Sequence, residues 1–167
     1  MPQVVLQGVL GADVVVDVCR SCRAFWFDPY ETLHLTPAAT IELFRLMAEG
    51  AGGGGPFPAE SHCPKCGSRL LLTHDRQRNT PFVYWRCDQG HGRFTPFVEF
   101  LKEKDFVRQL TPHQLAELRR MIGVIHCSGC GAPIDLAHDT VCGHCGAAIS
   151  MLDVQRLAEA VSNSRRR

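Results

Sequence analysis

The chain has 167 residues, of which 45% are hydrophobic and 21% charged, and its formal net charge is +1. A charge this close to neutral excludes the strong positive field that draws many proteins to nucleic acid. No apolar run approaches the roughly 18 residues that a membrane-spanning helix needs. The first residues, MPQVVLQG, lack the basic start of a secretory signal, so we expect a cytoplasmic protein with no membrane association.

The first predicted module, residues 1–49, combines a hairpin, a cysteine pair and a helix. Two β-branched runs in VVLQGVLGADVVVDV flank a turn-forming Gly-Ala-Asp and predict a β-hairpin. Cys19 and Cys22 follow it. Thr36 fits the N-cap and Pro37 the first position of a helix that we expect to extend to about Ala48. The predicted buried face of this helix comprises Ile41, Phe44, Leu46 and Met47.

Residues 50–60 form the predicted linker. The segment GAGGGGPFPA contains four consecutive glycines, which lose too much backbone entropy on folding to hold a regular element. Its two prolines stiffen the exit. We therefore expect this segment to separate the first module from the rest of the chain.

The second predicted module, residues 61–122, is a zinc ribbon followed by a pair of helices. Cys63-x2-Cys66 and Cys87-x3-His91 lie at the two ends of a segment that we interpret as two strands and a turn. The histidine stands between two glycines, so its ring can turn toward a metal. The alternative fourth ligands are His62 and His74.

Two Thr-Pro steps predict the helical pair of this module. Thr95-Pro96 would begin a helix over PFVEFLKEKDFVRQL. Thr111-Pro112 would begin a second helix over PHQLAELRRMI, which Gly123 ends.

The third predicted module, residues 123–167, is a four-cysteine zinc ribbon with a C-terminal helix. Two Cys-x-x-Cys pairs stand only eleven residues apart, a spacing at which a short hairpin brings them face to face. Asp153 would cap the helix that follows. The four predicted ligands are Cys127, Cys130, Cys142 and Cys145.

Metal binding is the strongest signal in this sequence. The chain has nine cysteines and eight histidines. Cysteines at Cys-x-x-Cys spacing, in a chain without a secretory signal, favour zinc in a reducing cytoplasm over disulfides. A redox dithiol of the thioredoxin type would need a βαβ setting that the pattern lacks. Iron is the alternative metal for a site of four thiolates. We expect two structural zinc ions per chain.

Cys19 and Cys22 have no second pair nearby, and a resemblance offers a context for them. In DVVVDVCRSCRAFWFDPYE, a strand ending in Val-Asp leads into Cys-x-x-Cys, an aromatic-Asp step and an acidic residue. This segment is similar to the second half of the transcription-factor-IIB-type zinc ribbon of bacterial proteins. The order of motifs along most of the chain resembles a bacterial zinc-ribbon protein type that is defined by its metal motifs and has no established activity. The matching residues are Val16, Asp17, Cys19, Cys22, Trp26, Asp28 and Glu31.

Three interpretations of this cysteine pair remain open. In the first, the thiols are a relic and pack as small apolar groups beneath Phe25, Trp26 and Phe27. In the second, His34 or Asp28 completes a site nearby. In the third, the linker brings distant groups to the pair, or a second chain completes it. The second and third interpretations would add a third zinc ion at Cys19 and Cys22. The distant groups considered are His62, or Cys63 with Cys66.

The predicted fold class is a small, metal-stabilised α+β protein in which short helices connect several zinc ribbons. We expect no enzyme and no small-molecule substrate, because a zinc with four protein ligands has no open position and no catalytic motif stands out. We expect the chain to bind an unidentified protein partner as an interaction or adaptor module. Nucleic-acid binding, in a transcription-related role, is the alternative, because basic residues interleave with aromatics that can stack on bases. These residues are Arg76, Arg78, Phe82, Tyr84, Trp85 and Arg86.

Overall fold

The alternation of apolar and polar residues at the start of the chain builds a β-hairpin, as predicted. Strands β1 (Gln3–Gln7) and β2 (Asp13–Cys19) pair antiparallel across a short 3-10 turn, η1 (Val9–Gly11). Every second residue of β2 is buried, beginning with Val14. The computed structural model describes residues 1–48, 58, 60–121, 123–127, 132–144, 146 and 148–152.

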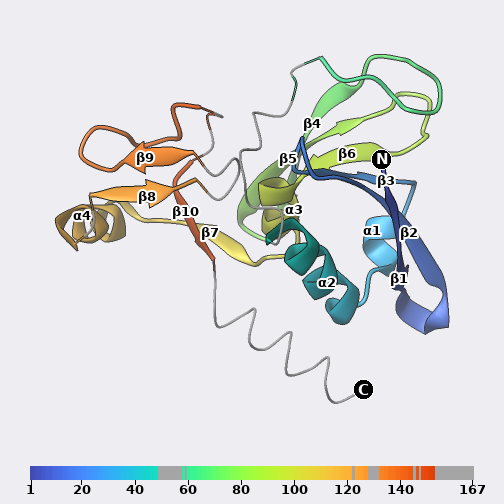
Figure 1. The fold of residues 1–167 in the computed structure, drawn as a ribbon, viewed down its shortest axis with the longest axis horizontal. Coiled ribbons are helices and arrows are strands. Elements are labelled where there is room, and N and C mark those ends of the chain that lie inside the picture. Colours follow the sequence, from blue (N-terminus) through green and yellow to red (C-terminus); the bar gives the residue numbers. More distant parts are fainter. Residues whose placement is uncertain are drawn as a thin grey trace.

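This hairpin belongs to a six-stranded antiparallel sheet with the order β1-β2-β3-β6-β5-β4 (Figure 1). The pairing of β3 with β6 joins segments from before and after the predicted linker in one sheet. The module boundaries that we drew from the sequence stay a prediction. The remaining strands are β3 (Ala24–Phe27), β4 (Leu71–Gln77), β5 (Thr80–Arg86) and β6 (Arg93–Pro96).

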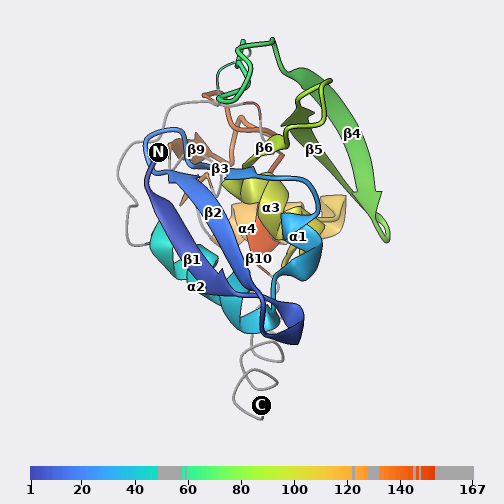
Figure 2. The ribbon, with the colours of Figure 1, turned by 90° about the vertical axis from the view of Figure 1, so that its right-hand side faces the viewer.

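Helices cover one face of the sheet beside β1, β2 and β3. Helix α2 (Pro37–Ala48) runs along the β1–β2 hairpin (Figure 2). It begins as predicted, because the backbone N–H of Ala39 donates to Oγ1 of Thr36 at 3.1 Å. The short helix α1 (Glu31–His34) precedes it, and α3 (Phe97–Glu103) follows β6 directly.

The buried face of α2 agrees with the prediction in part, since Ile41 and Met47 are buried as expected. Leu43, which we had not assigned to it, is fully buried at the centre of the main apolar cluster. Phe44 and Leu46 are only partly buried at the edge of that cluster. The inner face follows a spacing of four residues, through Ala39 and Leu43 to Met47, because these side chains point toward the valines of β2.

The helix predicted over residues 96–110 is shorter than expected. Helix α3 ends at Glu103, Asp105 has a left-handed φ of 61°, and the chain continues as strand β7 (Val107–Gln109). The helix ends early because Phe106 and Val107 are buried in the main core. A helix that continued straight through these residues would not place their side chains there. The predicted N-cap is also wrong, since the preceding threonine lies within β6 and Pro96 occupies that position.

The last described elements form two small two-stranded sheets. Helix α4 (Pro112–Met121) starts as predicted, with the Thr111 N–H donating to Oε1 of Gln114 at 3.1 Å. Strand β8 (Val124–His126) pairs with β9 (Pro133–Asp135), and β10 (Ser150–Leu152) pairs with β7. The predicted helix after residue 153 lies outside the described residues.

The protein is thus a small α+β fold with a dominant antiparallel sheet and few helices. Within the described part of the chain, no helix combines the length and the apolar character needed to cross a membrane.

Replacing Leu43 with alanine tests the main core. We expect Leu43→Ala to lower the free energy of unfolding by about 2–5 kcal/mol, because the side chain is 0% exposed and its removal leaves a cavity. Leu33→Ala is the control, since that leucine is 71% exposed and its loss should change stability by about 0.5 kcal/mol or less. Urea denaturation measures both, and equal effects of the two substitutions would contradict the assignment of the core.

Candidate metal centre

The first half of the candidate site is a tight loop before β4. The N–H of Cys63 donates to the carbonyl of Ser68 at 2.8 Å and closes the loop. The N–H of Lys65 points at Sγ of Cys63, 3.4 Å away. Gly67 turns the chain with a φ of +72°, a conformation that favours glycine. These contacts hold the Cys63 and Cys66 thiols on one side of the loop.

The second half follows β5. The N–H of Cys87 donates to the carbonyl of Gly92 at 2.9 Å, which brings His91 back beside the cysteine. Gly92 has a φ of +132°, and a Cβ added to it would collide with the backbone oxygen of Phe27 in β3. The close approach of two backbones therefore requires glycine here and presses the Cys87–His91 loop against the sheet.

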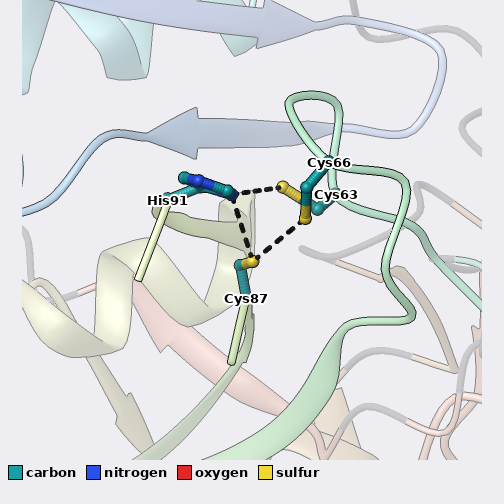
Figure 3. Close-up of side chains that lie close together, drawn as sticks. All are labelled: Cys63, Cys66, Cys87 and His91. Carbon is teal, nitrogen blue, oxygen red and sulfur yellow. Dashed lines mark hydrogen bonds between the residues drawn. The ribbon is translucent and has the colours of Figure 1, made fainter. Parts of the chain in front are cut away.

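The structure brings the four predicted residues of the second module together (Figure 3). Sγ of Cys66 lies 3.6 Å from Sγ of Cys87, and Nδ1 of His91 lies 3.6 Å from Cys87 Sγ and 3.8 Å from Cys63 Sγ. All four ligand atoms lie within 4.8 Å of one another, so this cluster could hold a metal ion. His91, rather than the alternatives, is the histidine of the group.

The thiols of the cluster differ in acidity. The side-chain and backbone hydrogen bonds from Ser68 lower the pKa of Cys66 to about 6, with His91 and Cys63 contributing in the same direction. Burial raises the pKa of Cys63. Cys66 is therefore largely a thiolate at neutral pH, and the thiolate is the form that binds metal.

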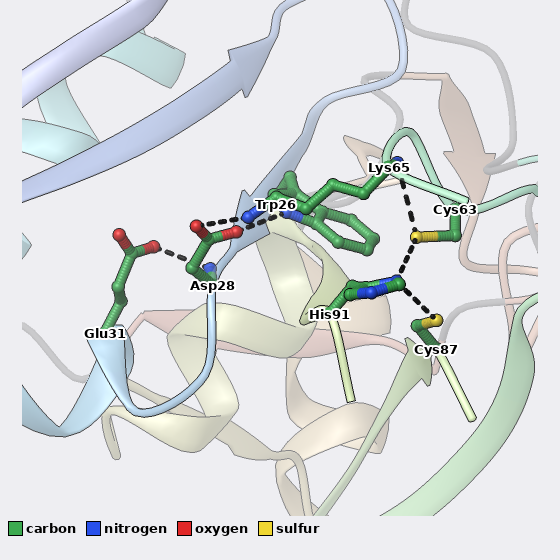
Figure 4. A network of polar contacts seen from close by, with 7 residues as sticks. All are labelled: Trp26, Asp28, Glu31, Cys63, Lys65, Cys87 and His91. Carbon is green, nitrogen blue, oxygen red and sulfur yellow. Dashed lines mark hydrogen bonds and ion pairs between the residues drawn. The ribbon is translucent and has the colours of Figure 1, made fainter. Parts of the chain in front are cut away.

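A network of polar contacts ties the cluster to the N-terminal part of the chain (Figure 4). Nε1 of Trp26 donates to Asp28 at 2.9 Å, and Nζ of Lys65, from the first loop, reaches the same carboxylate at 2.6 Å. The N–H of Asp28 in turn donates to Glu31 at 2.7 Å. The indole of Trp26 is buried against Cys63 and Cys87. Asp28, which the sequence suggested as a possible ligand of Cys19 and Cys22, instead contacts the loop that carries Cys63 and Cys66.

Cys19 and Cys22 lie at the end of β2 and in the following turn, both half-buried. Asp28 is engaged with Trp26 and Lys65. Among the residues that the structure describes, the pair belongs to no group of three candidate ligands, so neither a nearby group nor the distant cysteines complete it there. Burial raises the pKa of Cys19, but hydrogen bonds from Ser21 and Cys22 outweigh it and lower the pKa. Burial and the neighbouring Cys19 raise the pKa of Cys22.

The predicted four-cysteine site of the third module is described only in part. Cys127 and Cys142 are buried in one apolar cluster with Ile134, Leu136 and Ile149. Cys130 and Cys145 lie outside the described residues. This ligand set therefore stays a prediction.

No protein-family model matches this chain, and no curated protein or solved structure matches it significantly. The fold and the site define a small α+β protein with a cysteine- and histidine-rich candidate metal centre.

Removing one thiol tests the ligand set. We expect Cys66→Ser to lower the affinity for a divalent metal by more than about 100-fold. Loss of a residue that only orients a ligand typically costs about 10- to 100-fold, and loss of a ligand should cost more. His74→Ala is the control, because His74 lies on β4 outside the cluster and its loss should leave the affinity unchanged. Competition with a chromophoric chelator measures both, and an unchanged affinity of Cys66→Ser would exclude this residue as a ligand.

Two glycine substitutions test how the second half of the site is held. We expect Gly92→Ala to destabilise the protein and weaken metal binding, because its Cβ has no room against Phe27. Gly67→Ala also places alanine at a positive φ but in open space, so its cost is the backbone strain alone, about 1 kcal/mol. Thermal melts of the metal-loaded variants compare them, and a larger loss for Gly67→Ala would contradict the close approach.

Proposed function

We propose that this chain is a non-enzymatic zinc protein that binds another protein through a metal-stabilised scaffold. The donor set supports zinc. In a tetrahedron with zinc–sulfur bonds of about 2.3 Å, two sulfur atoms stand about 3.8 Å apart. The sulfur–sulfur separation of 3.6 Å between Cys66 and Cys87 is close to this value, and Nδ1 of His91 lies at similar distances of 3.6 and 3.8 Å from two sulfur atoms. Three thiols and one imidazole also suit zinc better than iron, for which four thiolates are the usual set.

The site supports a structural rather than a catalytic role. A catalytic zinc keeps one position for water or substrate, whereas three sulfurs and a nitrogen occupy all four positions of a tetrahedron. Strand β4 contains no fully buried residue, so a metal at the base of its hairpin would supply stability that packing of this strand does not. With the predicted four-cysteine site, the chain would hold two structural zinc ions in zinc ribbons, which agrees with the bacterial zinc-ribbon resemblance.

The observation that carries the binding proposal is the exposed apolar end of the β1–β2 hairpin. Val5 and Val15 face each other across the strands and are 62% and 37% exposed. Leu10, in the turn, is completely exposed and has a positive φ of 60°, which is rare for a leucine. Leu10 buries no surface within the chain, and its backbone conformation is strained. Neither property stabilises the fold, so we explain both by a contact with another molecule.

Nucleic-acid binding is the second candidate, favoured by an open hollow of about 590 Å³ that Arg76, Tyr84 and Arg86 help to line. The same region also holds acidic side chains, and Arg78 is paired with Asp105 at 3.1 Å. Of the three aromatics that suggested a stacking platform, Phe82 is buried and Trp85 packs against the metal-site cluster. The guanidinium of Arg93 lies over the ring of Tyr84, 4.3 Å from its centroid. This surface therefore favours nucleic acid less than the hairpin favours a protein.

Substitutions on the two surfaces separate the candidates. We expect Leu10→Asp combined with Val15→Lys to abolish capture of the partner, because charges replace the apolar contact. Arg76→Ser combined with Arg86→Ser is the matched control and should leave capture intact. The measurement is quantitative affinity purification with the zinc-loaded chain at low and high salt. Loss of binding in the arginine variant, together with release by salt, would instead support nucleic acid.

A further inference from the structure

Five hairpins in this chain share one backbone register around a cysteine. In each, the residue before the cysteine pairs antiparallel with the residue six positions after it. The cysteines are Cys19, Cys63, Cys87, Cys127 and Cys142, and the pairs are Val18↔Phe25, His62↔Arg69, Arg86↔Arg93, His126↔Pro133 and Val141↔Ala148. A register that recurs at five independent positions identifies one structural unit, the tight loop that holds a first metal ligand.

The loop at Cys19 shares the details of the loop at Cys63. In both loops a backbone N–H points at the first sulfur from 3.4 Å, that of Cys22 three residues after Cys19 and that of Lys65 two residues after Cys63. The residue four positions after the cysteine has a positive φ in both, 49° at Arg23 and 72° at Gly67. Arginine is disfavoured in this conformation, so the surrounding sheet holds the loop in the ligand-presenting shape without help from a glycine.

Four of the five loops lie together in pairs, and the loop at Cys19 is the fifth. The loops at Cys63 and Cys87 face each other and share the four-ligand cluster. The loops at Cys127 and Cys142 meet in one buried apolar cluster. The loop at Cys19 has two thiols and, within the described residues, no third candidate ligand. It is half of a site.

The half-site is accessible from outside the chain. Cys19 alternates with the buried Val18 and so faces the outer side of β2, where both thiols keep part of their surface in solvent. The two residues between the cysteines, Arg20 and Ser21, are exposed. Another molecule can therefore approach both sulfur atoms at once.

We propose that Cys19 and Cys22 hold a tetrahedral metal ion, zinc in the first instance, together with the same two cysteines of a second copy of the chain. This inference rests on the proposed zinc-binding role of the other loops. A second copy is the occupant that the observations favour, because a two-fold axis through the metal supplies an identical loop with the required two thiolates. Four thiols lose four protons on binding, and the resulting zinc–thiolate centre carries a charge of about −2. The exposed Arg20 of each copy contributes one compensating positive charge.

Native mass spectrometry of the full chain, kept anaerobic and titrated with zinc, tests this proposal. We expect dimers that hold one zinc ion more than two separate chains do. Cys19→Ser combined with Cys22→Ser should give monomers that lose only this shared ion. Leu33→Ala is the control, because Leu33 is 71% exposed and lies outside this loop, and this variant should remain dimeric.

Several results would overturn the proposal. A monomer that holds the additional zinc would show that one chain completes the site by itself, and a dimer that persists in the double serine variant would place the interface elsewhere. A dimer that survives strong chelation would be held by other bonds. A monomer with two zinc ions would remove this inference and leave the proposed role of the other loops intact, whereas a chain without any zinc would remove both.

Discussion

The constraint on which the rest of the structure depends is the convergence of four ligand atoms from two loops that are far apart in sequence. Cys63 and Cys66 precede the β4–β5 hairpin and Cys87 and His91 follow it, so the cluster closes this hairpin at its base. Strand β4 has hardly a buried residue, and hydrocarbon burial alone gives it little to pack against. The hairpin also has other anchors, since Phe82 of β5 is buried and the N–H of Val83 donates to Glu99 of α3 at 2.9 Å. A metal ion bound at the cluster would add a cross-link at the base of the hairpin.

Strand β3 connects this metal-centred region to an ordinary hydrophobic core. Its side chains alternate between the two faces of the sheet. Phe25 and Phe27 point into the main cluster, where they contact the ring of Phe100 in α3, while Trp26 packs on the other face against the cysteines. All four residues of β3 are buried for this reason. Strand β3 thus joins the candidate metal centre to the core, and the contact of Asp28 with Lys65 reinforces the same connection.

The β1–β2 hairpin, which carries no residue of the cluster, has exposed features at both ends of β2. The turn of the β1–β2 hairpin exposes Leu10, and the opposite end of β2 presents the two thiols of Cys19 and Cys22. Both ends of β2 are thus accessible to other molecules. Its inner face is buried in the core, where Val16 is 0% exposed. The surface proposed for binding is thus separate from the face of β2 that stabilises the fold.

The sequence by itself determined the local features: the β1–β2 hairpin, the N-caps at Thr36 and Thr111, and the ligand spacing that selected His91. Each depends on residues within a few positions of one another, where turn chemistry and capping act directly. Tertiary structure alone decided the pairing of β3 with β6, the buried position of Leu43, the early end of α3 and the role of Asp28. These depend on contacts between segments distant in sequence, and periodicity within a segment carries no information about which distant surface it will meet.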